Sequence, residues 1–191
     1  MTPKVIIISG KQGSGKTTLQ KQVQSKLYAL GNRVELINFA DIIYQIHDYA
    51  INVLEGVGVK RDLVKDGVLL QLLGTEWGRK TIQENVWCQI AKNRIENMAK
   101  NMHNVGYVIL GDCRFENELD FFPDALKIRL NCDREIRKAR CSQWRENDTH
   151  PSEVGLDMYS TAGAFNLYFD TGSVSIDDTV EITLKHLENW K

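Results

Sequence analysis

The stretch SGKQGSGKTT, residues 9–18, decides the fold of this chain because it fits the pattern G-x-x-x-x-G-K-[ST]. The apolar residues 5–8 precede it, and apolar residues at helical spacing follow it from Gly15 onward. A strand, a glycine-rich turn and a helix in this order are the context in which the pattern predicts a phosphate-binding loop. Its glycines let successive backbone N–H groups turn inward around an anion at the start of the helix.

Two side chains of this loop have expected roles of their own. Lys16 is expected to reach the terminal phosphates of a nucleotide, and the Thr17 hydroxyl to bind Mg²⁺. A glycine-rich turn that carries a solvated lysine is the alternative, but it does not explain why spacing and flanking pattern agree. The predicted ATP-binding residues are Gly13, Ser14, Gly15, Lys16, Thr17 and Thr18.

Composition limits the class of protein. The 191 residues suffice for one domain, 1–191, and a formal net charge of −1 does not indicate a broad nucleic-acid-binding surface. The four cysteines are dispersed and form no C-x-x-C pair, which argues against a zinc site and a disulfide framework. Without a signal-peptide pattern or a long apolar run, we expect a cytoplasmic protein with no membrane or nucleic-acid partner.

Strand-like and helical segments alternate along the chain. This alternation predicts an α/β fold with three layers, in which helices cover both faces of a five-stranded, mainly parallel sheet. Ligands of such sheets bind beyond the carboxyl ends of the strands, where the phosphate-binding loop also lies. The expected strands are residues 4–9, 33–39, 106–110, 125–131 and 165–169.

Two long segments elaborate this core. Residues 40–105 are predicted to be almost wholly helical, with helices at 41–54, 63–73 and 84–102, which is more than a crossover needs. Residues 133–153 are rich in arginine, and Arg137 and Arg140 share one face of a predicted helix. Ile136, Ala139 and Trp144 are expected on the opposite side of this helix, and Arg145 follows them. A further helix is expected to start at 151–153, directly after His150, with Thr149 as its capping residue.

The predicted third strand ends in charged residues. Asp112 follows the apolar run 107–110, an arrangement in which a carboxylate beside the phosphate-binding loop orients Mg²⁺. Arg114 is two residues later and therefore on the same side, where its guanidinium could hold a phosphate with two parallel hydrogen bonds. A structural ion pair between these two residues is the alternative.

A second pair of candidates follows the predicted apolar helix 63–73. Gly74 and Gly78 loosen the backbone around Arg79, which could bind a second phosphate, while Gln71 could meet the edge of a base. A helix terminus followed by a solvated basic residue would give the same pattern.

The chain shows no nucleophile elbow, no protein-kinase signature and no metal-binding histidine motif. Transfer of a phosphoryl group to another phosphate needs none of them, since the accepting oxygen is already ionised and catalysis becomes positioning and charge neutralisation. Cations aimed at two separate phosphates are then expected. The candidates are Lys16, Arg79, Arg114, Arg137 and Arg140.

Taken together, these motifs resemble the small P-loop nucleoside monophosphate kinases, and among them the bacteriophage-type deoxynucleoside monophosphate kinases. Five pieces carry the resemblance over most of the chain. They are GKQGSGKTT (10–18), NFAD (38–41), LLQLLGTEWGR (69–79) with Trp87, GDCRFENELD (111–120) and HPSEVGLD (150–157). The most specific is D-x-R-F-x-N-E at residues 112–118, together with the H-x-S-E piece.

The resemblance implies a P-loop NTPase fold, ATP and Mg²⁺ at the loop, an acceptor site lined by the first helical segment (about 40–105) and a lid formed by the second (about 133–153). It implies dNTP biosynthesis in the cytoplasm of a phage host. The catalytic residues would be Lys16, Arg114, Arg137 and Arg140, and the metal-binding residues Thr17 and Asp112. The acceptor-binding residues would be Asp41, Gln71, Arg79, Arg114 and Glu118. In the last strand, NLYFDTGS, Asp170 replaces an expected asparagine, so contacts of the adenine near Asp170 and Ser173 stay open.

The leading hypothesis is transfer of the γ-phosphate of ATP to a deoxynucleoside monophosphate. A kinase for dephospho-coenzyme A, a nucleoside or a phosphorylated metabolite is one rival, and a switch that slowly hydrolyses ATP is another. The preferred base, the choice between deoxyribose and ribose, and whether the protein forms a homodimer are left open.

Overall fold

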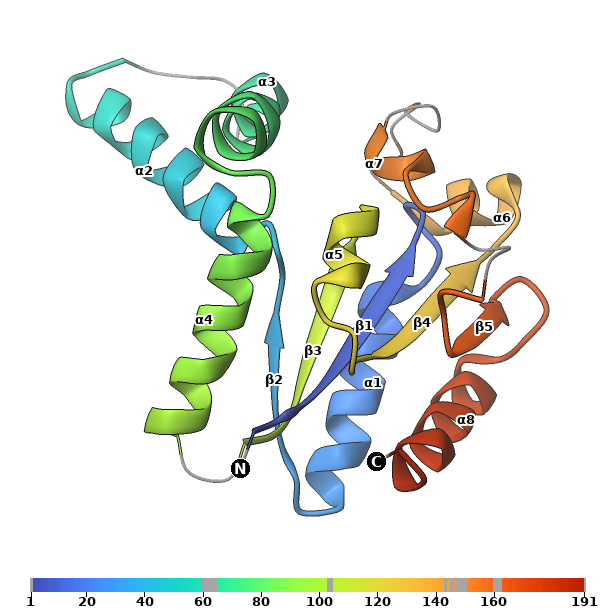
Figure 1. The fold of residues 1–191 in the computed structure, drawn as a ribbon. Helices are drawn as coiled ribbons and strands as arrows, with labels where there is room; N and C mark the ends of the chain where they lie inside the picture. Colours follow the sequence, from blue (N-terminus) through green and yellow to red (C-terminus); the bar gives the residue numbers. More distant parts are fainter. Residues whose placement is uncertain are drawn as a thin grey trace.

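The computed structural model describes residues 2–59, 65–102, 105–142, 144, 146, 151–159 and 163–190. Its centre is a five-stranded sheet in the order β2-β3-β1-β4-β5 (Figure 1). The strands are β1 (Lys4–Gly10), β2 (Arg33–Ile37), β3 (Val105–Cys113), β4 (Leu126–Asn131) and β5 (Leu167–Asp170). All pairings among these strands are parallel, so the α/β prediction is confirmed and the expectation of a mainly parallel sheet becomes a wholly parallel one.

Helices cover the sheet on both faces, as a parallel sheet requires. Ile6 and Ile8 of β1 belong to one apolar cluster, which includes residues of α1 and α8, whereas Ile7 belongs to the cluster beneath α4. All three isoleucines are fully buried. The helices are α1 (Lys16–Ala29), α2 (Asp41–Gly56), α3 (Gly67–Gln71), the π-helix η1 (Leu72–Ile82), α4 (Val86–Asn101), α5 (Glu116–Asp120), α6 (Arg134–Arg140), α7 (Pro151–Val154) and α8 (Ile176–Glu188). Within the described residues, no helix is long and apolar enough to span a membrane.

The carboxyl edge of the sheet is shaped by close backbone contacts. A Cβ atom at Gly10 would lie 2.7 Å from the Leu130 carbonyl oxygen of β4, so only glycine fits where β1 enters the loop. In the pairing of β1 with β3, Ile7 is opposite Leu110 but Ser9 is opposite Cys113. The extra residue in β3 is a β-bulge, which changes the direction of the end of β3 beside the loop.

The helical segment between β2 and β3 differs from its prediction in one respect. The apolar helix does not end before Arg79: α3, capped by the Asp66 side chain, continues directly into η1. Wider π-helical turns appear there, as in the bond from Gln83 N–H to the Gly78 oxygen (3.0 Å). Glycine at 78 is needed because its Cβ would lie 2.1 Å from the Trp87 ring. The predicted end of this helix at residue 73, before Arg79, is therefore wrong, and residues 63 and 64 of the predicted helix lie outside the described part of the chain.

In the arginine-rich segment, helix α6 spans Arg134–Arg140. Trp144 was expected opposite the arginines, but its ring lies 5.3 Å from the Arg137 guanidinium and 5.6 Å from that of Arg134. The expectation is wrong because α6 ends before Trp144, so helical spacing does not apply to it. Helix α7 begins at Pro151, whereas Arg145, Thr149 and His150 lie outside the described residues.

Candidate active site

The phosphate-binding loop connects β1 to α1 at the carboxyl edge of the sheet (Figure 1). Gly13 and Gly15 have φ values of +76° and +93°, which side chains other than glycine rarely adopt. The Lys16 ammonium donates hydrogen bonds to the carbonyl oxygens of Gly10 (2.6 Å) and Lys11 (2.9 Å), folding back across the loop. The positions that the motif reserves for glycine are thus ones where the backbone has a positive φ angle.

The electrostatics around Lys16 favour an incoming anion. The pKa of the Lys16 ammonium is lowered to about 8, mainly by burial and then by the nearby Arg114 charge, while the Glu153 charge opposes the fall. A phosphate would supply the negative charge that the ammonium lacks in this setting, and binding would raise the pKa again.

This shift predicts a pH dependence for nucleotide binding. Since only the protonated ammonium attracts phosphate strongly, the affinity for ATP should fall as the pH rises above about 8, well before an ordinary lysine loses its proton. Calorimetric titration with ATP between pH 6.5 and 9.5 measures this, with the Lys16→Arg variant as the control that stays charged. An affinity that is flat up to pH 9.5 in the unaltered protein would contradict the assignment.

Arg114 follows the end of β3 and faces the loop. Its Nη1 donates to Glu153 Oε1 (2.6 Å), and Glu153 Oε2 accepts the Gln12 backbone N–H (2.9 Å). The Arg114 side chain is 38% exposed, whereas that of Glu153 is only 3% exposed. The predicted phosphate-gripping arginine therefore lies next to the phosphate-binding loop, bridged to it by a buried carboxylate.

Asp112 lies at the bulge of β3 and accepts two backbone hydrogen bonds, from Phe39 (2.8 Å) and Ala40 (3.0 Å). Burial raises the pKa of its carboxyl group, and these two N–H groups oppose the rise. The next residue, Cys113, pairs with Ser9 of β1, which places Asp112 beside the start of the loop. Nearby, Asp41 at the start of α2 accepts hydrogen bonds from the Asn38 N–H (3.0 Å) and from Arg94 (2.9 Å).

Two oxygen donors near the loop suit Mg²⁺. In the described part of the chain, no three His, Cys, Asp or Glu side chains are grouped to hold a metal by themselves. Mg²⁺ does not need such a cage: it keeps several waters and takes one or two protein oxygens together with substrate phosphates. The hydroxyl of Thr17 and the carboxylate of Asp112 are hard oxygen donors of this kind, so the residues present fit the ion.

Arg79 of η1 and Glu118 of α5 form an ion pair in which Glu118 is buried and Arg79 is 19% exposed. Arg79 Nη2 donates to Glu118 Oε1 (2.8 Å), while Glu118 Oε2 accepts the backbone N–H groups of Arg114 (2.7 Å) and Phe115 (3.2 Å). Burial raises the pKa of Glu118 to about 7, with the Asp112 charge as the second cause. Although they come from distant helices, the two predicted acceptor residues are thus joined to each other and to Arg114.

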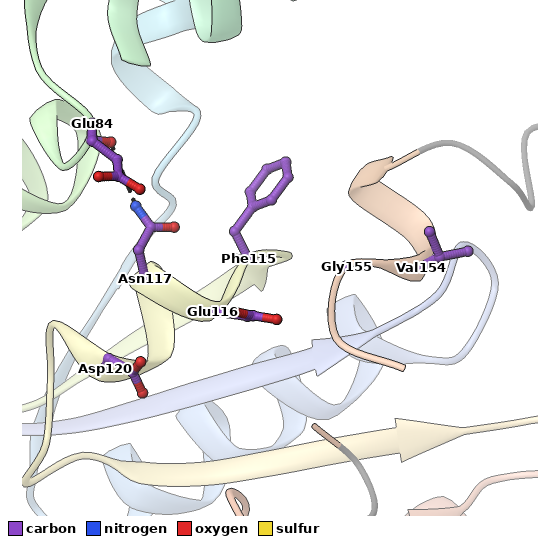
Figure 2. Close-up of a pocket in the computed structure, with 7 residues that line it drawn as sticks. All are labelled: Glu84, Phe115, Glu116, Asn117, Asp120, Val154 and Gly155. Atoms are coloured by element: carbon purple, nitrogen blue, oxygen red, sulfur yellow. Dashed lines mark hydrogen bonds between the residues drawn. The ribbon is translucent and has the colours of Figure 1, made fainter. Parts of the chain in front are cut away.

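A cleft of about 530 Å³ opens beside this pair. Figure 2 shows the Phe115 ring pointing away from the chain, with Glu84 and Asn117 on one side and Val154 and Gly155 on the other. The Arg79 guanidinium lies 4.3 Å from the centre of the Phe115 ring. An aromatic ring with a cation on its face is thereby held at the rim of the cleft.

The two arginines of α6 lie in different surroundings. Arg137 is buried, and its Nη1 donates to the Gln12 carbonyl oxygen (3.1 Å) of the loop. A Cβ at Gly13 would lie 2.6 Å from the Arg137 carbonyl oxygen, so α6 packs directly on the loop. Arg140 is exposed and donates to the Thr171 carbonyl oxygen (2.9 Å), in the segment expected near the adenine. Thr171 Oγ1 in turn donates to the Ser14 carbonyl oxygen (3.0 Å).

The remaining predicted residues are less central. Gln71 is exposed at the end of α3, and it is absent from the linings of the two described clefts. Thr17 and Thr18 belong to the first turn of α1. The Ser14 hydroxyl is fully buried and has no hydrogen-bond partner within the described residues.

Sequence reasoning missed a second row of charges beneath the loop. Arg129 of β4 is 3% exposed and donates to Ser9 Oγ (2.9 Å) and to Asp157 Oδ1 (2.9 Å), and Asp157 also pairs with Lys11 (2.7 Å). An arginine within the apolar run 125–131 was the available signal, because an ionised side chain enters a core only with partners. Glu153 belongs to the H-x-S-E piece, but its sequence context offers no reason to name it as a site residue.

Comparisons with known proteins place this arrangement in a family. A family model described as AAA domain matches residues 6–155. No curated protein sequence matches significantly. Three similar solved structures are shikimate kinase from Bacteroides thetaiotaomicron (17% identity, 97% of this chain and 98% of that one, TM-score 0.53), TT1252 from Thermus thermophilus (15%, 99% and 98%, 0.62) and a sugar kinase from Janibacter sp. (16%, 97% and 95%, 0.54).

At these identities the structures show a shared fold and no more. The family model, in contrast, covers most of the chain, including the loop, β3 and the Glu153 segment. The chain belongs to the AAA domain family and has the P-loop kinase fold.

Proposed function

We propose that this protein transfers the γ-phosphate of ATP to the phosphate of a deoxynucleoside monophosphate and so forms the diphosphate. The observation that carries the proposal is that Arg114, at the end of β3, is bridged through the Glu153 carboxylate to the loop that carries Lys16, so that two cations from separate elements lie at one site. Two cations that repel each other across one small space are suited to two phosphate groups, one from each substrate.

The proposed reaction is a direct displacement. An ionised oxygen of the acceptor phosphate attacks the γ-phosphorus, a new P–O bond forms, and the bond to the β-phosphate oxygen breaks to release ADP. The acceptor oxygen carries no proton that must be removed, so no general base is assigned. Lys16 and the loop N–H groups hold the ATP phosphates, while Arg114 holds the acceptor phosphate. Thr17 and Asp112 would hold Mg²⁺, which neutralises phosphate charge when bound.

The arginines of α6 are proposed to act on the ATP side. Arg137 reaches the loop backbone and could turn toward the transferring group, where developing charge on the equatorial oxygens favours a cation. Arg140 contacts Thr171, next to the segment that would border the adenine. Both residues stay assigned as catalytic within this proposal.

The acceptor side supports a substrate with a planar base. The Phe115 ring is adjacent in sequence to Arg114, and it offers a surface for stacking, while Arg79 and Glu118 fix its position. Asp41 and Gln71 are proposed to line the same acceptor region from α2 and α3. A base stacked there would carry its own phosphate toward Arg114.

The experiment that tests the proposal is an ADP-release assay with Mg·ATP and each common deoxynucleoside and nucleoside monophosphate. Shikimate, simple sugars and dephospho-coenzyme A represent the second candidate function, another small-molecule kinase, which the likeness to shikimate and sugar kinases favours. Stimulation by one or more deoxynucleoside monophosphates, with the diphosphate found by chromatography, is the expected result. Stimulation only by shikimate, a sugar or dephospho-coenzyme A, or equal release without any acceptor, would contradict it.

A further inference from the structure

The buried carboxylate of Glu153 has the two partners that a phosphate oxygen would seek. Its Oε2 accepts the Gln12 backbone N–H of the phosphate-binding loop at 2.9 Å, and its Oε1 accepts the Arg114 guanidinium at 2.6 Å. Backbone N–H groups of a glycine-rich loop and an arginine are the usual donors to phosphate. The carboxylate therefore lies between the donor proposed for ATP and the donor proposed for the acceptor.

A carboxylate and a phosphate cannot share these donors. Both are anions, and the Glu153 side chain is only 3% exposed, so there is little water to screen their repulsion. Either the phosphate or Glu153 occupies the position. We propose that Glu153 is a resident anion that fills a phosphate-oxygen position in the free protein and is displaced when the substrate phosphates bind.

The segment that carries Glu153 has a second attachment, which does not compete with phosphate. Asp157 lies four residues further along the chain, beyond the end of α7, and pairs with Lys11 (2.7 Å) and with Arg129 (2.9 Å). Arg129 is anchored in β4 and bonds Ser9 at the end of β1. Glu153 can thus leave the loop while Asp157 keeps the segment nearby, so that displacement is local and reversible.

Two consequences follow for the phosphate site. The resident carboxylate neutralises part of the positive charge of Lys16 and Arg114, which stabilises the site while no substrate is bound. It also weakens phosphate binding, because only the molecules in which Glu153 has left the position can bind a phosphate there. In addition, when a phosphate of ATP displaces Glu153, the Arg114 guanidinium is released from the carboxylate and becomes available to an acceptor phosphate.

The test measures binding of tripolyphosphate by calorimetry, which requires no acceptor. We expect Glu153→Gln to bind it about tenfold more tightly than the unaltered protein, as follows if the carboxylate fills the site about 90% of the time. Asp157→Asn is the matched control, since it removes one negative charge beside the same loop but leaves both Glu153 contacts, and we expect at most about a twofold gain there. Equal gains in the two variants would show a general field effect and overturn the proposal.

If Glu153→Gln does not fold, a second variant, Glu153→Asp, tests the displacement of Glu153 by phosphate. Glu153→Asp keeps the charge, but its shorter side chain cannot bridge the Gln12 N–H and Arg114 at their observed separations. Displacement predicts about threefold tighter binding of tripolyphosphate, whereas unchanged or weaker binding would refute it. Because the probe is inorganic, these results stand whether or not the acceptor is a deoxynucleoside monophosphate, and a failed acceptor screen leaves them unaffected.

Discussion

Replacement of Lys16 by alanine is expected to lower kcat/KM for phosphoryl transfer by about 10³-fold, the size of effect seen when one preorganised charged donor is removed from a transition state. Lys16 is the ammonium that folds across the loop, and its pKa of about 8 shows how far burial has separated it from water. The fold should persist, because the loop is held by glycine geometry and by contacts with β4 and α6 rather than by this side chain.

Steady-state kinetics of Lys16→Ala measure the loss of kcat/KM, and a thermal melt measures whether the fold persists. Lys21→Ala is the matched control, since Lys21 is exposed on the same helix, α1. Both variants should melt close to the unaltered protein, and only the Lys16 variant should lose transfer. Full activity in Lys16→Ala would remove the basis for the phosphate-binding assignment.

Replacement of Arg114 by alanine should raise KM for the acceptor by about 10²-fold, while the affinity for ATP changes little. A guanidinium that binds a phosphate with two hydrogen bonds contributes on this scale, because charge-assisted hydrogen bonds are about twice as strong as neutral ones. Arg114→Lys should lose an intermediate amount, since an ammonium keeps the charge but lacks the two-pronged geometry.

The measurement is a full kinetic matrix over both substrates, with ATP affinity also determined by calorimetry. Arg33→Ala serves as a control because Arg33 lies in β2, its side chain is 42% exposed, and its guanidinium pairs with Glu35 two residues along the same strand. A selective loss of ATP affinity with an unchanged acceptor KM would show that Arg114 belongs to the nucleotide site instead.

Much of the fold could be predicted from local patterns. The positions of β1, the loop and α1 follow from glycine spacing and apolar periodicity, and helix α1 ends at Ala29, shortly before Gly31 with its φ of +82°. Strand β5 began two residues later than predicted, at Leu167, because Phe165 is buried in a core cluster rather than paired in the sheet. Apolar runs mark burial well but strand ends poorly.

Some positions in the candidate site could likewise be predicted from the sequence, and others could not. Lys16, Asp112 and Arg114 were predictable, since each stands at a strand end or loop whose position follows from its neighbours in sequence. The continuation of α3 into η1 was not, because the Trp87 indole that donates to the Gly74 carbonyl oxygen (2.8 Å) comes from the next helix. The same holds for Trp144, whose place depends on where α6 ends.

The sequence by itself determined the phosphate-binding loop, the alternation of strands and helices, and the set of arginines available for phosphates, because these depend on residue spacing along the chain. Only the tertiary structure decided which charges meet. Glu153 and Asp157 reach the loop from beyond β4, and Arg129 reaches Ser9 across the paired strands β1 and β4. Such contacts depend on packing between distant segments, and a buried charge takes whichever partner the completed fold brings within hydrogen-bonding distance.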